Sequence, residues 1–565
     1  MHGIAEADAR VGGPVPRAET ERRHILTVSL EEWFHGGALS RVVLSKHWDR
    51  FESRIDRSVD EALAVLDRYG ARATFFVLGV LADRNPGIVG RIARAGHEVA
   101  SRGYWPRGVA GMTADEFAED LDRTAAAIAA AGGGAVRGFR SPRWLQRQDL
   151  WIFEVLAKKG YVYDASINPV GWSFAGRREF HTVRRHDLAV GGSLVEVPVS
   201  TTSVGGFRVA IAGGNWMRQL PHALLSRAVA RWHRQRRDPL VFYLTSWELD
   251  PEQPQITAAS RWSSVRQYRN LGRTRWCLEQ YLQRYRFESI AEHLGLPRVD
   301  APGPRAAPHV DGATPSAPAA PSPPPQAAER TTVSLVVPMF NEEDNIQYLL
   351  RTLSTVATRA GDGLRLQLVL VDDCSRDRTW EVLKHACAGR VDVQLLRHEQ
   401  NRGVAAAIMT GIRAAQSEIV CTIDCDCSYD PMDLLQMVPM LGDADMVTAS
   451  PYHPQGQVLN VPRWRLLLSR TLSWIYRRLL RVELHTWTSC FRVLRRSRVV
   501  DLELQHGGFL GVAELLVRVL RRGGVVREYP TLLESRLLGV SKMKTLRTIR
   551  GHLGLLWQVV RGRVR

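Results

Sequence analysis

VSLVVPMF (333–340), LQLVLVDD (366–373) and EIVCTIDCD (418–426) decide the fold of the trailing part of the chain. Each is an apolar, largely β-branched run that ends in polar residues, which is typical of a strand buried on both faces of a sheet. Between them the pattern predicts a helix starting near Glu343, a helix around TWEVLKHA (379–386), a strand VQLLRH (393–398) and a helix GVAAAIMTGIRAA (403–415). This alternation predicts a parallel, doubly wound α/β sheet with ligands at the carboxyl ends of its strands.

Polar side chains follow three of the predicted strands, and carboxylates should therefore converge on one sheet edge. These residues are Asn341, Glu342, Glu343, Asp372, Asp373, Asp424 and Asp426. The D-x-D of Asp424 and Asp426 has the spacing needed to hold a hard divalent cation that also grips a diphosphate. A D-x-D alone occurs by chance in chains of this length. Together with PMFNEE, VDDCSRDRT and GVAAAIMTGI in this order, it is specific.

At these motifs residues 332–550 resemble the family-2 glycosyltransferases, and within them the dolichol-phosphate mannosyltransferase-like and polyprenyl-phosphate sugar transferases. The resemblance implies an α/β domain of the glycosyltransferase A type, an inverting transfer, a nucleotide-diphosphate sugar donor, and Mg²⁺ or Mn²⁺ held by Asp424 and Asp426. Ser428 stands where some relatives have Gln, so no third protein ligand is implied. The donor contacts that the resemblance implies are Pro338, Phe340, Asn341, Glu342, Val371, Asp373 and Cys425.

Charge is polarised within this region. Residues 331–459 carry 10 Lys+Arg and 17 Asp+Glu, whereas residues 460–565 carry 22 and 6. The acidic half suits a metal site, and the basic half suits an anionic acceptor such as a polyprenyl phosphate, which guanidinium groups can hold in bidentate contacts. The acceptor candidates, at positions where the resemblance also puts phosphate contacts, are Arg470, Arg492, Ser541 and Lys542. We expect most other arginines on solvated helix faces.

Glu514 begins a predicted helix that faces the site. Because a phosphate acceptor is already ionised at neutral pH, it needs no general base. We therefore expect Glu514 to be a positioning residue if the acceptor is a phosphate, and the candidate base if it is a glycan hydroxyl.

Two amphipathic segments, 464–480 and 542–560, place Trp, Tyr, Leu and Ile beside Arg and Lys. Either could lie on a membrane surface, although a helix packed within a domain has the same pattern. Cys421, Cys425 and Cys427 are expected to be buried strand cysteines rather than a thiolate metal site, because alternate strand residues face opposite ways.

The composition describes globular domains. The chain has 565 residues, 45% of them apolar, seven cysteines and a net charge of +18, and it lacks an apolar run of about 18 residues that could span a membrane. Residues 1–23 carry charges throughout, which predicts a disordered N-terminus. They also lack the apolar core of a signal peptide. We therefore expect a cytoplasmic protein at the inner face of the membrane. A basic nucleic-acid-binding protein is the rival interpretation. It is disfavoured because no recognised nucleic-acid module is present.

A segment with ten prolines, residues 297–330, divides the chain and is predicted to be a semi-extended linker. It separates a leading domain (24–296) from the trailing domain (331–565). In the leading domain, apolar runs alternate with amphipathic stretches, which again indicates α/β. Five motifs there, TVSLEEWFHG, RATFFVLGV through HEVASRGY, VRGFRSPRW, YDASINP and FYLTSWELDPEQP, resemble those of polysaccharide deacetylases, which implies a distorted (β/α) barrel.

The resemblance also implies that the deacetylase chemistry is lost. Ser29 stands at the position of the Asp base, Arg102 and Pro106 at the two metal-binding His, and Thr245 at the acid His, which leaves a carboxylate only at Glu31 or its neighbour Glu32. A hydrolytic zinc site normally needs three protein ligands, so we expect no zinc and an inactive domain. A bifunctional transferase and deacetylase would need a rebuilt metal site. Arg140 and Trp247 occupy positions that shape a sugar cleft, which leaves carbohydrate binding and a purely structural role both open.

Overall fold

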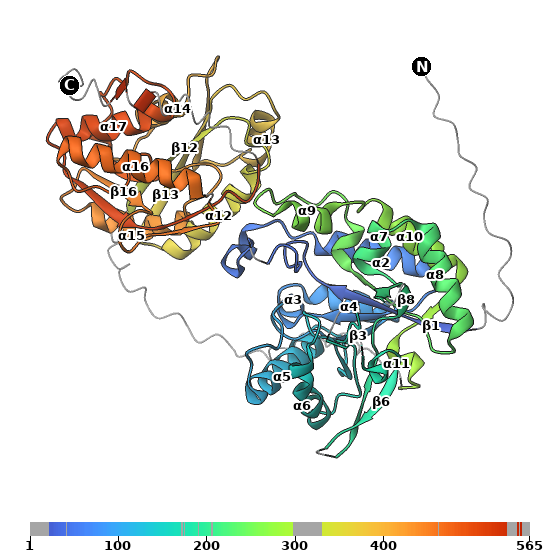
Figure 1. The fold of residues 1–565 in the computed structure, drawn as a ribbon. Coiled ribbons are helices and arrows are strands. Elements are labelled where there is room, and N and C mark those ends of the chain that lie inside the picture. Colours follow the sequence, from blue (N-terminus) through green and yellow to red (C-terminus); the bar gives the residue numbers. More distant parts are fainter. Residues whose placement is uncertain are drawn as a thin grey trace, which may run out of the picture. The chain divides into compact units, whose positions relative to one another are not determined.

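The computed structural model describes residues 22–40, 42–170, 173–174, 176–189, 191–204, 207–297, 330–461, 463–539, 551–552 and 554–555. The chain divides into two compact units (Figure 1). Unit 1 consists of Met1–Ser40, Ser53–Gln253 and Trp262–Thr314, and unit 2 of Arg41–Glu52, Pro254–Arg261 and Pro315–Arg565. Nearly all of the predicted disordered N-terminus and of the predicted linker lies outside the described residues.

Unit 1 is built on a sheet of nine described strands. They are β1 (Arg23–Leu30), β2 (Thr74–Val77), β3 (Glu98–Ser101), β4 (Gly138–Phe139), β5 (Tyr163–Asp164), β6 (Arg184–Asp187), β7 (Ser193–Glu196), β10 (Val241–Thr245) and β11 (Arg286–Glu288). The order is β10-β1-β2-β3-β4-β5-β7-β6, with β11 also paired to β1. Every pair is parallel except β6 with β7. The predicted α/β architecture is confirmed, and the described strands form an open sheet with β10 and β6 at its ends.

Helices and a separate hairpin complete unit 1. The helices are α2 (Ile55–Arg68), α3 (Gly79–Arg84), α4 (Pro86–Arg94), α5 (Ala114–Ala130), α6 (Ile152–Lys158), α7 (Gly214–Gln219), α8 (His222–Gln235), α9 (Arg261–Tyr268), α10 (Arg273–Arg284) and α11 (Ile290–His293), with 3₁₀ helices at Arg147–Trp151, Arg178–Phe180 and Ser246–Leu249. The hairpin pairs β8 (Thr201–Val204) with β9 (Phe207–Ala210). After Arg23, every residue of β1 is buried, and the register places Ser29 beside Thr245.

Unit 2 has a seven-stranded sheet. Its strands are β12 (Thr331–Met339), β13 (Leu364–Asp372), β14 (Val393–Arg397), β15 (Ile419–Thr422), β16 (Met446–Ser450), β18 (Arg492–Arg495) and β19 (Val526–Pro530), and β17 (Gln457–Leu459) pairs separately with β20 (Leu532–Glu534). The order is β14-β13-β12-β15-β18-β16-β19. The four predicted strands, β12 to β15, are parallel as expected, but β18 runs antiparallel to both of its neighbours. The sheet is therefore mixed, not wholly parallel.

The helices of unit 2 bury the sheet. They are α12 (Ile346–Ala360), α13 (Thr379–Ala386), α14 (Val404–Ala414), α15 (Leu434–Leu441), α16 (Arg463–Leu480) and α17 (Phe509–Arg521), with 3₁₀ helices at Ser45–Arg50, Pro431–Asp433 and Arg496–Arg498. α14 packs on β12 and α17 packs on α14, so that Val336, Ile408 and Leu516 share one core. None of the described helices is both long and apolar enough to cross a membrane.

Two short segments from the leading part of the sequence pack within unit 2. In the first, Lys46 and His47 both contact the Glu534 carboxylate, at 2.9 and 3.0 Å. Burial alone would raise the pKa of Glu534, but these contacts hold it at about 2. In the second, the Thr257 N–H donates to the carbonyl of Leu537 at 2.8 Å. The boundary at residue 296 drawn from sequence thus misses both segments, because nothing in their composition separates them from the leading domain.

The packing of α14 on β12 makes a stability prediction. A Cβ at Gly411 would lie 2.3 Å from Cγ1 of Val336, so Gly411→Ala should overpack the core and lower the free energy of unfolding by about 1–3 kcal/mol. Urea denaturation of the full chain measures this. Gly363→Ala is the matched control, because its Cβ would meet only the Ala360 carbonyl oxygen, at 3.5 Å. Equal midpoints for the two variants would contradict the packing described here.

Candidate functional site

A pocket of about 280 Å³ lies at the carboxyl ends of the parallel strands of unit 2. Pro338 and Phe340 reach it from the end of β12, Asp373 from the end of β13, and Asp424 and Cys425 from the segment after β15. The pocket is lined by Pro338, Met339, Phe340, Glu342, Asp373, Asn401, Gly403, Val404, Asp424, Cys425, Gly508, Phe509 and Arg536. Most of the donor residues expected from the sequence therefore meet at one place, as the strand order requires.

Two predicted donor residues, Val371 and Asn341, are not among the residues that line the pocket. Val371 is fully buried inside β13. Asn341 adopts a left-handed conformation with φ of 54°, and its amide oxygen accepts a hydrogen bond from the N–H of Arg376 at 2.7 Å. The Asn341 N–H donates to Ser375 Oγ at 2.8 Å. Asn341 thus joins the loop after β12 to the loop after β13, and asparagine tolerates this backbone conformation better than most residues.

The two carboxylates of the D-x-D motif have different surroundings. Desolvation, together with repulsion from Asp426, raises the pKa of Asp424 above its ordinary value. Asp426 Oδ2 accepts a hydrogen bond from Nε of Arg536 at 2.9 Å, and the Arg536 guanidinium also lies 3.6 Å from Glu342. One guanidinium therefore lies beside two carboxylates, Asp426 and Glu342, that come from distant parts of the sequence.

Asp373 fixes the loop that closes one side of the pocket. Its carboxylate accepts hydrogen bonds from the N–H groups of Arg402 and Gly403, at 2.8 and 2.7 Å, and lies 2.7 Å from Nδ1 of His398. Gly403 has φ of 93°, and a Cβ there would lie 2.5 Å from the carbonyl oxygen of Gly507. Because the loops at 403 and 507 approach each other closely, only glycine fits at position 403.

Glu514 is buried in α17, outside the pocket lining. Its carboxylate accepts hydrogen bonds from the N–H groups of Gln505 and His506, at 2.9 and 3.0 Å, and from Nε of Arg518 at 2.8 Å. Burial alone would raise the pKa of Glu514, but these bonds and the charge of Arg518 hold it below its ordinary value. Glu514 thereby fixes the turn that leads to Gly508 at the pocket.

Two of the four predicted acceptor residues, Arg470 and Arg492, lie among the described residues. Arg470 is exposed on α16, with its guanidinium 5.6 Å from the ring centre of Tyr452. Arg492 is buried in β18 and donates to the carbonyls of Trp487 and Val512, and burial lowers its pKa to about 10. Ser541 and Lys542, like most of the predicted amphipathic segment 542–560, lie outside the described residues.

Some lining residues were missed by the sequence interpretation. The pocket lining includes Asn401, Phe509 and Arg536. Of these, Arg536 forms an ion pair with Asp426. Gly403 was part of a quoted motif, but only its positive φ shows why it is glycine. Nothing in the sequence separates Arg536 from the other basic residues after position 459. The expected burial of Cys421, Cys425 and Cys427 is confirmed, although only the first lies on a strand.

In unit 1 the degenerate deacetylase positions meet at the end of β1. Arg102 donates from Nε to Oε1 of Glu31 at 2.9 Å and from a terminal nitrogen to Oγ of Ser29 at 3.0 Å. Both members of the Arg102–Glu31 pair are buried. Thr245 caps the following 3₁₀ helix, and its N–H donates to Glu248 at 3.0 Å. Where the resemblance places a base and a metal, the chain has an internal ion pair.

Glu32, Arg140 and Pro106 have different surroundings. The Glu32 carboxylate accepts from the Arg54 N–H at 3.2 Å and also bonds the hydroxyl of Ser53. Burial raises its pKa to about 6. Arg140 is fully buried, donates to Thr27 and to the Ala165 carbonyl, both at 2.9 Å, and has a pKa lowered to about 9 by burial and by the charge of Arg102. Pro106 lies in the loop after β3. Arg140 therefore supports the sheet from inside.

Comparison with known proteins finds three family models along the chain. Residues 48–163 match the family model Polysaccharide deacetylase, residues 165–295 match Domain of unknown function (DUF3473), and residues 334–501 match Glycosyl transferase family 2.

Curated relatives match the trailing region. Dolichol-phosphate mannosyltransferase of Pyrococcus furiosus is 28% identical over 215 residues, which are 38% of this chain and 59% of that protein. Polyprenol monophosphomannose synthase of Mycolicibacterium smegmatis is 29% identical over 224 residues, 38% of this chain and 81% of that protein. The chain thus spans about three fifths of the first relative's length.

A solved structure also covers this region: glucosyl-3-phosphoglycerate synthase from Mycobacterium tuberculosis in complex with Mn²⁺ and uridine-diphosphate-glucose. It is 19% identical, with a TM-score of 0.32 over 41% of this chain and 79% of that one. The chain therefore joins a polysaccharide deacetylase-like domain in its leading part to a family-2 glycosyltransferase domain in its trailing part.

Proposed function

We propose that unit 2 is an inverting transferase that moves a sugar from a nucleotide-diphosphate donor to a polyprenyl phosphate. The observation that carries this proposal is the placement of Asp424 and Asp426 directly after β15. They lie at a pocket whose lining also includes Phe340 and Asp373. The names of the two curated relatives support a lipid-phosphate acceptor. The basic residues of unit 2 accompany this transferase domain, which favours an anionic lipid over the nucleic-acid alternative.

The carboxylates fit a hard divalent cation, Mg²⁺ or Mn²⁺. Asp424 and Asp426 offer only oxygen donors, and desolvation together with repulsion from Asp426 raises the pKa of Asp424, which a bound cation would counter. A bound cation would supply charge neutralisation for the donor diphosphate. Arg536 would then be free to contact the same phosphates, while Pro338, Phe340 and the loop held by Asp373 enclose the nucleoside.

The environment of Glu514 favours a phosphate acceptor over a glycan hydroxyl. A general base must reach the proton that it removes, but this carboxylate already accepts four hydrogen bonds, from Gln505, His506 and Arg518, and lies outside the pocket lining. A phosphate needs no such base. Glu514 is therefore proposed as a positioning residue that fixes the turn before Phe509.

The metal assignment makes a prediction for donor turnover. Asp424→Ala and Asp426→Ala should each lower metal-dependent sugar transfer roughly 1,000-fold, because a catalytic metal contributes several kcal/mol. The assay measures nucleotide release from a panel of nucleotide-diphosphate sugars with Mg²⁺ or Mn²⁺. Asp443→Ala is the control, since Asp443 is exposed, pairs with Arg527 and does not line the pocket. Near-normal transfer by either pocket variant, or full activity in excess chelator, would overturn the assignment.

The outer face of α16 supports docking on a membrane. Trp464, Leu467 and Trp474 are 52%, 68% and 59% exposed, which is unusual for large apolar side chains on one helix. Arg470 and the pair at 477–478 are exposed on the same helix. Aromatic and aliphatic side chains beside arginines suit the interface of an anionic bilayer. We propose that α16 lies on such a surface, near a lipid-phosphate acceptor.

This arrangement predicts salt-sensitive binding to anionic vesicles, with each well-placed basic residue contributing up to roughly 1 kcal/mol. Co-sedimentation with phosphatidylglycerol vesicles at low and high salt measures it. The triple variant Trp464→Ser, Leu467→Ser and Trp474→Ser should lose most of the bound fraction. Trp262→Ser is the control, because Trp262 is 85% exposed but belongs to unit 1. Unchanged binding by the triple variant would show that another surface docks.

We also propose that unit 1 hydrolyses no acetyl group. Arginine side chains are positively charged at physiological pH, and Arg102 places one where the resemblance puts a cation. The hydroxyls of Ser29 and Thr245 do not titrate near neutrality, so neither replaces the base or the acid. The bifunctional alternative would require a metal site built from other residues.

The full chain should accordingly contain no stoichiometric zinc by elemental analysis and release no acetate from N-acetylated oligosaccharides. A second measurement tests the ion pair directly. Glu31→Gln leaves the buried Arg102 unpaired and should lower the free energy of unfolding by about 3–5 kcal/mol, whereas Glu252→Gln breaks only an exposed pair and should be nearly neutral. One bound zinc per chain with metal-dependent acetate release would refute the proposal.

A further inference from the structure

Unit 1 has an open cleft at the positions where the resemblance places deacetylase catalytic residues, although other residue types stand there. A cavity of about 310 Å³ lies between the end of β1, the loop at 141–144 and the α7 and α9 segments. This volume is within the range of small-molecule sites. The sugar transfer proposed for unit 2 uses none of its residues, so the cleft needs an explanation of its own.

The cleft wall carries more positive than negative charge. Its charged residues are Glu31, Arg102, Arg143, Arg218, Glu248 and Arg266. Two of the arginines are neutralised within the wall, because Arg102 pairs with Glu31 and Arg218 pairs with Glu248 at 2.9 Å. The side chains of Arg143 and Arg266 are exposed, and neither makes an ion pair or hydrogen bond to another described residue. Two uncompensated guanidinium groups therefore remain in the cleft.

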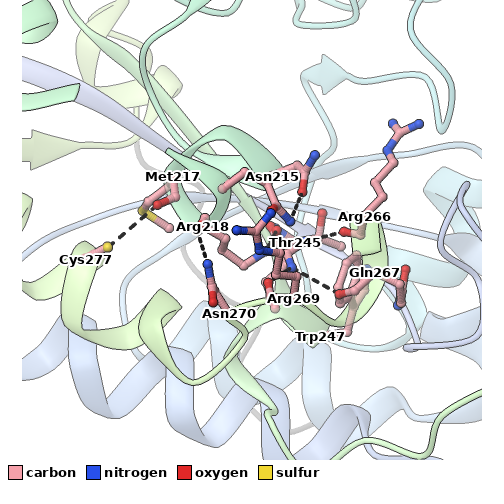
Figure 2. A network of polar contacts seen from close by, with 12 residues as sticks. Asn215, Met217, Arg218, Thr245, Trp247, Arg266, Gln267, Arg269, Asn270 and Cys277 are labelled. Atoms are coloured by element: carbon pink, nitrogen blue, oxygen red, sulfur yellow. Dashed lines mark hydrogen bonds and ion pairs between the residues drawn. The ribbon is translucent and has the colours of Figure 1, made fainter. Parts of the chain in front are cut away.

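A buried arginine holds one side of this cleft rigidly. Arg218 is 1% exposed, and its terminal nitrogens donate to the carbonyls of Arg266, Gln267 and Arg269 at 3.0 to 3.1 Å. Figure 2 shows these bonds converging on Arg218, while the Arg266 side chain extends away from the network with no bond from its guanidinium. Because its backbone is fixed, Arg266 can meet a ligand at little cost in backbone entropy.

The rest of the wall suits a saccharide. The rings of Trp144 and Tyr243 meet edge to face at 5.5 Å, and Trp247 also lines the cleft. Such aromatic rings give a sugar an apolar surface beside polar groups. The wall thus combines an aromatic surface with spare positive charge.

From these features we propose that the cleft of unit 1 binds an anionic saccharide, one that carries a carboxylate or a phosphate. The anionic group pairs with Arg143 and Arg266, and the sugar ring lies against Trp144 and Tyr243. The site binds without hydrolysing, and it is separate from the donor and acceptor of unit 2.

Isothermal titration calorimetry on the full chain tests this with three probes: a galacturonic acid trisaccharide, glucose 1-phosphate and the neutral trisaccharide maltotriose. Arg143→Gln combined with Arg266→Gln should weaken binding of the anionic probe about 100-fold, since each charge-assisted hydrogen bond contributes roughly tenfold. Both residues are exposed, so folding should be preserved. Arg227→Gln combined with Arg231→Gln removes the same charge from exposed positions on α8 outside the cleft, and should leave binding unchanged.

The outcomes separate the sources of the charge. Binding of the uronic acid probe that depends on both cleft arginines identifies a carboxylated glycan, and the same dependence with glucose 1-phosphate identifies a phosphorylated sugar. Equal affinity for maltotriose, no binding of either anionic probe, or equal weakening by the two double variants would overturn the proposal. Sugar transfer by unit 2 should be the same in both double variants, which keeps this test independent of the transferase proposal.

Discussion

A carboxylate that is buried at the end of a strand needs a compensating positive charge, and this constraint applies in both units. An unpaired buried charge costs several kcal/mol, more than most single contacts contribute. In unit 1, Glu31 is compensated by Arg102, and in unit 2, Asp426 is compensated by Arg536. Within α17 the buried Glu514 is likewise paired with Arg518, while it accepts hydrogen bonds from the N–H groups of Gln505 and His506 in the preceding turn. Guanidinium groups therefore accompany the carboxylates at these two strand ends.

Much of this architecture could be predicted from the sequence, because the information is local. Apolar runs of strand length fixed β12, β13 and β15, and parallel pairing then brought their ends together, which placed Asp373 and Asp424 at one pocket. The same reasoning could not show that β18 inserts antiparallel between β15 and β16, since strand order depends on contacts between distant segments.

The parts that escaped prediction depend on long-range geometry. The sequence predicts Arg492 as a phosphate ligand, because it lies in a basic region. In the structure it is buried and donates hydrogen bonds to backbone carbonyls. Arg536 is one basic residue among many in its region, and only the fold brings it to Asp426. The segment at 41–52 has no compositional mark, and its place in unit 2 follows from Lys46 and His47 meeting Glu534.

The contact between Arg536 and Asp426 has a consequence for how the pocket handles ions. A divalent cation bound at Asp424 and Asp426, as proposed above, would compete with this guanidinium for the Asp426 carboxylate. Because Arg536 belongs to the chain and stays beside the pocket, the cation would add two positive charges there without removing one. The diphosphate of the proposed donor would bring the negative charge that offsets this excess.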